Sequence, residues 1–264
     1  MKLKFAGIRR GKVFSPNHVE NDAMILKKVG EELEKYGGIV SYYDEDMLDE
    51  KFIREKFVFS MVRSKKALNQ LKKLEQNGTI VLNHVDGVLN CFRERNLKYM
   101  SDYMISHPKS IVVNTDEPES VVHKLKHFNT NKLWVKRDSH AIHREDVTKV
   151  FTHDECVNIL REYNRRGIDK AIIQEHIQGS ELKFYAVRET EFFRWYYVNG
   201  GHQHEFDVDV LKIAANHTAK LTNVHFYGGD AIISEEGKIY IIDFNDWPSF
   251  ARFRNEAARS EEHT

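Results

Sequence analysis

The chain has 264 residues, which is enough for one large domain or two to three smaller lobes with a buried core, and this excludes a disordered chain. Lys and Arg number 40 and Asp and Glu number 40, so the formal net charge is zero and no overall field favours binding to nucleic acid or to an anionic membrane. The sequence contains no run of about 18 apolar residues, and its charged start is unlike a signal peptide, so we expect a soluble, cytoplasmic protein.

Residues 3–83 alternate predicted strands with predicted helices. Apolar residues recur at helical spacing between Met24 and Tyr36, and again between Ala67 and Leu74, where Ser64 is placed to cap the helix. Apolar runs that suit strands lie at 3–8, 39–43, 57–62 and 79–83. This alternation predicts a small, mostly parallel α/β layer.

After about residue 90 the pattern changes to strand pairs separated by helices. Helical stretches are predicted at 90–107 and 154–166. We expect strands at 110–114, 132–136, 171–174, 182–187, 192–198, 231–233 and 239–244. The last two flank a turn at 234–238 and form a hairpin, so antiparallel pairing is predicted in this half of the chain.

This hairpin carries a group of oxygen-bearing side chains. Asp243 and Asn245 are two residues apart in a predicted strand, so they share one face, and Asp230 brings a third oxygen from the partner strand. Such oxygens suit a hard cation, Mg²⁺ in particular, because Mg²⁺ keeps water ligands and shares substrate phosphates. The alternative is a hairpin end with polar caps; two apolar strands that lead to clustered acids favour the metal.

Two lysines suggest an anionic ligand, and one connector suggests a heterocycle and a sugar. Lys136 ends an apolar strand and Lys183 lies in another, where an ammonium group favours a partner such as phosphate. A lone lysine at a strand end more often extends into water, so this alternative stays open. The connector 175–181 follows a buried strand, so its free backbone groups can pair with a flat heterocycle, and Glu181 can accept hydrogen bonds from sugar hydroxyls.

In their order along the chain these segments resemble the ATP-grasp superfamily. The family motifs are a lysine before a phosphate-covering loop, a hinge that reads Glu-x-x-x-Gly-x-Glu, a metal-binding acid, and an acid-x-Asn pair before a proline. The matching positions are Lys136, Glu175 to Glu181, Asp230, Asp243 with Asn245, and Pro248. Residues 61–68 and the leucine-rich helix after them resemble the subgroup that contains the ribosomal protein S6 modification enzyme and glutathione synthetase.

The resemblance covers roughly residues 90–250 and implies an α/β (α+β) ATP-grasp fold with an N-terminal Rossmann-like lobe. This lobe would span residues 1–92, and the ATP-grasp domain would span 93–264. Within that domain we expect a central or lid part at about 93–173 and a C-terminal lobe at about 174–258.

The resemblance also implies roles for individual residues. Lys136 would contact phosphates, Gln174, Glu175 and Ile177 would bind adenine, Glu181 would bind ribose, Lys183 would lie near the transferred phosphate, and Asp230, Asp243 and Asn245 would hold Mg²⁺ or Mn²⁺. The first phosphate-binding cation of the family has no clean match, and the candidates are Arg95 and Lys98. Because the loop 137–143 lacks the glycines found in many relatives, we expect Arg137, Ser139 and His140 to donate from their side chains.

The implied activity is an ATP-dependent carboxylate–amine ligase that forms a carbon–nitrogen bond through an acyl phosphate. Its substrates would be ATP, a small-molecule or peptide carboxylate and an amine acceptor, with Arg194 and Arg252 as candidates to act on the second substrate. The alternative for Arg252 is a C-terminal helix with solvated arginines. Other functions left open are a small-molecule kinase similar to inositol polyphosphate kinases and a nucleotide-binding regulator without turnover; nucleic-acid binding is disfavoured, and a homo-oligomer is left open.

Overall fold

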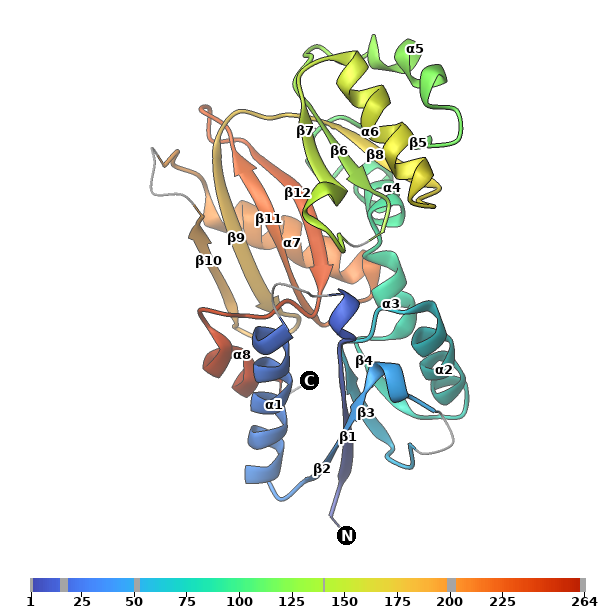
Figure 1. Cartoon of the computed structure of the whole chain (residues 1–264). Helices are drawn as coiled ribbons and strands as arrows, with labels where there is room; N and C mark the ends of the chain where they lie inside the picture. The colour runs from blue at the N-terminus through green and yellow to red at the C-terminus, as the bar shows by residue number, and fades with distance from the viewer. Residues whose placement is uncertain (1, 15–18, 50–52, 140, 199–202, 262–264) are drawn as a thin grey trace.

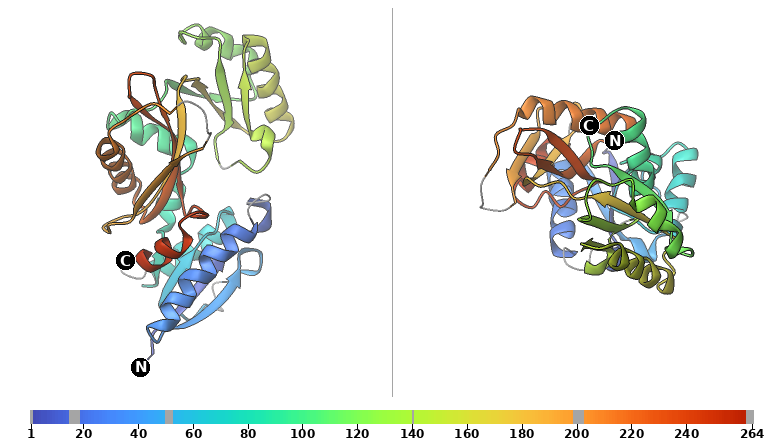
Figure 2. Two further views of the ribbon diagram at one scale, coloured as in Figure 1. Left: turned by 90° about the vertical axis from the view of Figure 1, so that its left-hand side faces the viewer. Right: turned by 90° about the horizontal axis from the view of Figure 1, so that it is seen from above.

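The computed structural model describes residues 2–14, 19–49, 53–139, 141–198 and 203–261. Within these ranges the strands form three four-stranded sheets. Figures 1 and 2 show one sheet in an N-terminal lobe at one end of the molecule, a second at the opposite end, and the third between them. The chain termini both lie beside the N-terminal lobe (Figure 1).

The N-terminal lobe is the predicted parallel α/β layer. Its strands pair in the order β2-β1-β3-β4, and every pairing is parallel. Its elements are β1 (Lys4–Arg9), α1 (Val19–Lys35), β2 (Ile39–Asp44), β3 (Phe57–Ser60), α2 (Lys65–Gln76) and β4 (Ile80–Leu82), with the short 3-10 helices η1 (Lys12–Phe14) and η2 (Glu45–Met47). The predicted cap is confirmed, because the Ser64 side chain accepts a hydrogen bond from Ala67 N at the start of α2.

The middle sheet is antiparallel and has the order β5-β8-β6-β7. Its elements are β5 (Ser110–Asn114), η3 (Pro118–Ser120), α5 (Val121–Leu125), β6 (Leu133–Arg137), η4 (Arg144–Asp146), β7 (Val147–Val150), α6 (His153–Arg165) and β8 (Lys170–Glu175). The predicted helix 90–107 corresponds to the shorter α4 (Arg93–Asp102), and a further short helix, α3 (Val85–Asn90), precedes it. They carry the chain from the N-terminal lobe to this sheet (Figure 1).

The third sheet is antiparallel in the order β10-β9-β11-β12. Its elements are β9 (Ser180–Val187), β10 (Phe193–Tyr197), α7 (Val208–Thr222), β11 (Phe226–Ile233), β12 (Ile239–Asp246) and the final helix α8 (Arg254–Glu261). Apolar residues of α7 and of this sheet form one buried core, and α8 packs against α1 and β9. The C-terminal segment therefore returns to the N-terminal lobe.

Apolar packing changes from one core to another close to the domain boundary that we propose at 92/93. Val85 and Val88 belong to the core of the N-terminal lobe, whereas Cys91 and Met100 belong to the core of the third sheet. The N-terminal lobe also shares a core with the third sheet. Residues of α1, β3, β9 and α8 contribute to it. The N-terminal lobe is thus packed firmly onto the third sheet.

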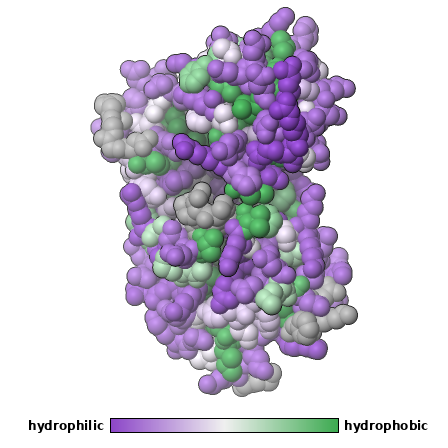
Figure 3. Space-filling model, in the orientation of Figure 1, coloured by the Kyte–Doolittle hydropathy of each residue, from purple (hydrophilic) through white to green (hydrophobic). Residues whose placement is uncertain are grey.

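In the described part of the chain, every helix is too short or too polar to span a bilayer. Hydrophilic residues cover most of the face seen in Figure 3, and hydrophobic residues form only small patches on it.

Candidate active site

Two adjoining chambers lie where the three sheets meet. The first has a volume of about 560 Å³ and is lined by the β8–β9 connection, β6 and β12. The second has a volume of about 650 Å³ and is lined by the third sheet, the β6–β7 connection and the N-terminal lobe. Residues common to both linings are Arg93, Ala141, Val147, Asp230 and Asp243. The two chambers are therefore parts of one cleft.

The β11–β12 hairpin places the three predicted metal ligands at the boundary between the chambers. Asp230 lies opposite Asp243 in the strand register, and Asn245 lies opposite Gly228. Asp243 and Asn245 share a face of β12, and the Asn245 side chain helps to lower the pKa of Asp243. Asp230 and Asp243 line both chambers, whereas Asn245 lines the second one.

The carboxylates of Asp230 and Asp243 each form an ion pair with a basic side chain. Lys183 Nζ lies 2.5 Å from Asp230 Oδ1, and Arg93 Nη2 lies 3.3 Å from Asp243 Oδ2. Burial raises the pKa of Asp230, and Lys183 offsets this only in part. Burial alone would also raise the pKa of Asp243, but the charges of Arg93 and Lys136 outweigh it and hold that pKa below its ordinary value. Asp243 is therefore an anion available to a metal ion.

The donor set fits Mg²⁺. Among the described residues no group of three or more His, Cys, Asp or Glu side chains forms a complete metal cage. Asp230, Asp243 and Asn245 offer two carboxylates and one amide, which is a partial set of oxygen ligands. Such a set suits Mg²⁺ because this ion retains waters and shares oxygens of a bound phosphate.

Lys136 provides a buried cation in the first chamber. Its side chain is 6% exposed, and Nζ donates to the carbonyl oxygen of Ile242 at 3.0 Å. Burial lowers the pKa of Lys136 to about 8, although Asp243 opposes the shift. An ammonium group with a neutral carbonyl as its direct partner can be stabilised further by an anionic ligand.

The β8–β9 connection lines the first chamber as the sequence predicts for a nucleotide hinge. Gln174, Glu175, Ile177 and Glu181 all contribute to this lining. Gln174 is buried and its Nε2 donates to Ser110 Oγ at 3.2 Å, which fixes the end of β8. The side chains of Ile232 and Ile242 add apolar surface to the same chamber. A flat, partly apolar group with polar edges fits these surroundings.

Arg93 lines the cleft, whereas Arg95 and Lys98, the two candidates for the first phosphate-binding cation, do not. Both of those side chains are exposed on α4, and neither is among the described residues that line the cleft. Lys98 pairs instead with Asp102 at 2.5 Å on the outer surface. Arg93 begins α4, lines both chambers and is 15% exposed. The only signal for it in the sequence is a basic residue at the start of the predicted helix.

Of the three residues predicted to be catalytic, one lies inside the cleft and two lie outside it. Lys183 lines the second chamber. Arg194 is bound through Nη2 to Glu256 of α8 at 2.7 Å, and the guanidinium of Arg252 lies 3.7 Å from the ring centroid of Tyr196. Neither arginine is among the described residues lining either chamber, so this geometry does not support the predictions for Arg194 and Arg252.

The β6–β7 connection is organised by an aspartate in place of glycines. Asp146 is fully buried and accepts hydrogen bonds from Ile142 N at 2.8 Å and His143 N at 3.1 Å. It also pairs with Arg166 and lies 3.6 Å from Arg137 Nη1. These two backbone amides are therefore committed to Asp146. The predicted donors Arg137 and Ser139 bond to each other, and His140 lies outside the described residues.

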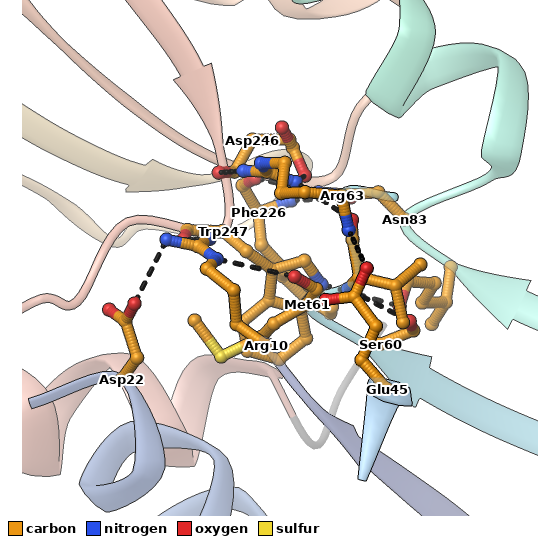
Figure 4. Close-up of polar contacts among 12 residues, drawn as sticks. Arg10, Asp22, Glu45, Ser60, Met61, Arg63, Asn83, Phe226, Asp246 and Trp247 are labelled. Atoms are coloured by element: carbon orange, nitrogen blue, oxygen red, sulfur yellow. Dashed lines mark hydrogen bonds and ion pairs between the residues drawn. The ribbon is translucent and has the colours of Figure 1, made fainter. Parts of the chain in front are cut away.

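A buried polar network fixes the end of β12 to the N-terminal lobe (Figure 4). Arg63 Nη1 lies 2.5 Å from Asp246 Oδ2, and Nη2 donates to the Asp246 carbonyl oxygen at 2.9 Å. Arg10 donates to Asp22 at 3.0 Å and to the Trp247 carbonyl oxygen at 2.9 Å. Burial, together with the nearby charge of Arg63, lowers the pKa of Arg10 to about 10. The network lies at the end of β12, the strand that carries Asp243 and Asn245.

Comparison with known proteins finds similarity in structure only. No protein-family model matches the chain, and no curated protein matches it. D-alanyl-alanine synthetase A from Vibrio cholerae is 13% identical with a TM-score of 0.75, over 99% of this chain and 93% of that one. D-alanine–D-alanine ligase from Bacillus anthracis, complexed with ATP, is 16% identical with a TM-score of 0.70, over 95% of this chain and 88% of that one.

A RimK domain ATP-grasp protein from Sphaerobacter thermophilus is 12% identical with a TM-score of 0.74, over 97% of each chain. These similarities extend over nearly the whole chain and include the N-terminal lobe as well as the two antiparallel sheets. The predicted α/β architecture is confirmed, and the chain has the ATP-grasp fold.

Proposed function

We propose that this protein is an ATP- and Mg²⁺-dependent carboxylate–amine ligase. The observation that carries the proposal is the shared wall of the cleft, where Asp230 and Asp243 face both chambers. A nucleotide in the first chamber and an acid in the second would meet at these carboxylates. A ligase from Bacillus anthracis with the same fold is known in complex with ATP, which supports ATP as the nucleotide in this proposal.

The proposed reaction has two steps. A carboxylate oxygen of the acid attacks the γ-phosphorus of ATP, the bond to the β-phosphate oxygen breaks, and an acyl phosphate and ADP result. The amine then attacks the carbonyl carbon and releases inorganic phosphate and a proton, which leaves a new carbon–nitrogen bond. Both steps bring anions or dipoles together, so positioning and electrostatic stabilisation are the main contributions required from the protein.

Each residue of the cleft has a proposed task in this reaction. Lys136 and Arg93 would neutralise phosphate oxygens, the 174–177 segment would bind the adenine, and Glu181 would bind the ribose. Lys183 would lie beside the acid and the transferred phosphoryl group. Bound Mg²⁺, held by Asp230, Asp243 and Asn245, would offset the charge of the phosphates.

Product analysis tests the proposed activity. The purified protein is incubated with Mg²⁺, ATP and mixtures of carboxylic acids and amines, and ADP, inorganic phosphate and amide products are measured. Ligation predicts ADP and phosphate in equal amounts, both dependent on acid and amine. A stable phosphoester with ADP and no free phosphate would indicate a kinase, and nucleotide binding without ADP formation would indicate a regulator; either result contradicts the proposal.

Nucleotide affinity is expected to fall as the pH rises through about 8. Lys136 has a pKa of about 8 in the free protein, so it is mainly charged below this pH and mainly neutral above it. A bound phosphate favours the charged form, so binding at higher pH requires uptake of a proton and weakens by up to roughly tenfold per pH unit. Calorimetry with ADP between pH 7 and 9 measures this slope. The Lys136→Gln variant should bind more weakly and lack the slope; an equal slope in this variant contradicts the assignment.

A further inference from the structure

Arg93 contacts two parts of the cleft that belong to different elements. Its Nη1 donates to the carbonyl oxygens of Arg137 at 3.2 Å and Ser139 at 2.7 Å. Its Nη2 reaches Asp243 Oδ2 at 3.3 Å. One guanidinium group therefore joins the root of the β6–β7 connection to a proposed metal ligand.

The donors of Arg93 are not all used by the protein. Its Nε is buried and has no hydrogen-bond partner among the described residues, although the side chain lines both chambers. A buried N–H without an acceptor is unfavourable, so an additional acceptor from a ligand would stabilise it. An oxygen-rich anion in the cleft would supply such an acceptor.

Two backbone amides of the β6–β7 connection are already used within the protein. The amides of Ile142 and His143 are given to Asp146, so they are not free to bind phosphate. The contacts of Arg93 with the carbonyl oxygens of residues 137 and 139 are thus direct links from this connection to the centre of the cleft.

We propose that Arg93 is a positioning residue that fastens the β6–β7 connection to the nucleotide. The inference rests on the proposed function, because it takes the first chamber as the nucleotide site. In the free protein, Nη1 holds the carbonyl oxygens and Nη2 holds Asp243. With Mg²⁺ and nucleotide bound, Nη2 and Nε turn to phosphate oxygens while Nη1 keeps the carbonyl oxygens, so the nucleotide orders the connection.

The planar shape of the guanidinium group is essential to this role. Its five N–H donors point in different directions, so it can serve carbonyl oxygens on one edge and an anion on another. A lysine keeps the charge for phosphate but presents a single ammonium group on a flexible stem. The Arg93→Lys variant should therefore keep the charge that attracts the nucleotide but lose the hydrogen bonds that hold the β6–β7 connection.

Hydrogen exchange of a peptide covering 138–147 tests the proposal. It is measured for the wild type, for Arg93→Lys and for the control Arg95→Lys, each without nucleotide and with Mg²⁺ and ADP at concentrations that calorimetry shows to be saturating. Arg95 is exposed on the same helix and makes the control well matched. Exchange in α6 (His153–Arg165) serves as the internal reference for intact folding.

We expect Mg²⁺ and ADP to slow exchange of this peptide in the wild type and in Arg95→Lys. In Arg93→Lys we expect exchange roughly tenfold faster without nucleotide, with little slowing on addition of ADP. Wild-type behaviour of Arg93→Lys in both states overturns the proposal, as does unchanged exchange in a wild type that binds ADP. If calorimetry finds no nucleotide binding, the proposed function fails; in that case the rates without nucleotide still decide whether Arg93 holds the connection.

Discussion

Replacement of Asp243 by alanine is expected to reduce Mg²⁺-dependent ATP turnover by roughly 10²–10³-fold, the usual effect of removing one electrostatic group from an active site. The reason is twofold. The change removes a proposed metal ligand, and it leaves Arg93 and Lys136 without the carboxylate whose pKa their charges lower. Turnover is measured by ADP release over a range of Mg²⁺ concentrations.

Glu145→Gln is the matched control for this variant. Glu145 is an exposed acid of the β6–β7 connection and is not among the described residues lining the cleft. Its turnover should equal that of the wild type. Asn245→Ala should share the defect of Asp243→Ala, because these two side chains lie on one face of β12 and line the same chamber. Wild-type turnover in both site variants, with the fold intact, would refute the metal-site assignment.

The second large effect concerns stability. Arg63→Met is expected to lower the free energy of unfolding by about 3–5 kcal/mol, the usual cost of breaking a buried ion pair on one side. Asp246 is fully buried and would lose both the side-chain contact at 2.5 Å and the donor to its carbonyl oxygen. Urea unfolding followed by circular dichroism measures the change.

Two controls make this prediction specific. Arg9→Met breaks a pair with Asp44 in the same lobe, but these side chains are 42% and 56% exposed, so the expected loss is only about 0–1 kcal/mol. The double variant Arg63→Met with Asp246→Leu removes both charges and should regain much of the lost stability. Equal losses for Arg63→Met and Arg9→Met would contradict the account of the interface in Figure 4.

Local patterns in the sequence were sufficient for much of the fold and for part of the site. The α2 helix follows from its cap at Ser64 and its apolar stripe, and the hairpin follows from two apolar runs around a turn. The shared face of Asp243 and Asn245 follows from strand alternation alone. These features depend on residues close together in the chain.

The features that the sequence could not indicate depend on contacts between distant elements. Arg93 could not be preferred over Arg95 or Lys98, because the choice depends on how α4 is rotated toward the two chambers. Arg194 was predicted to act on the substrate, but α8 brings Glu256 to it from the end of the chain. The role of Asp146 in the glycine-poor connection likewise depends on Arg166, which lies beyond α6.

A crystal structure with Mg²⁺ and a non-hydrolysable ATP analogue tests the proposed nucleotide and metal sites. We expect the adenine beside residues 174–177, the phosphates beside Lys136 and Arg93, and Mg²⁺ bound by Asp230, Asp243 and Asn245. The second chamber would remain open beyond the γ-phosphate for the acid. An analogue bound outside this cleft, or a metal ion bound away from the three predicted ligands, would contradict the account.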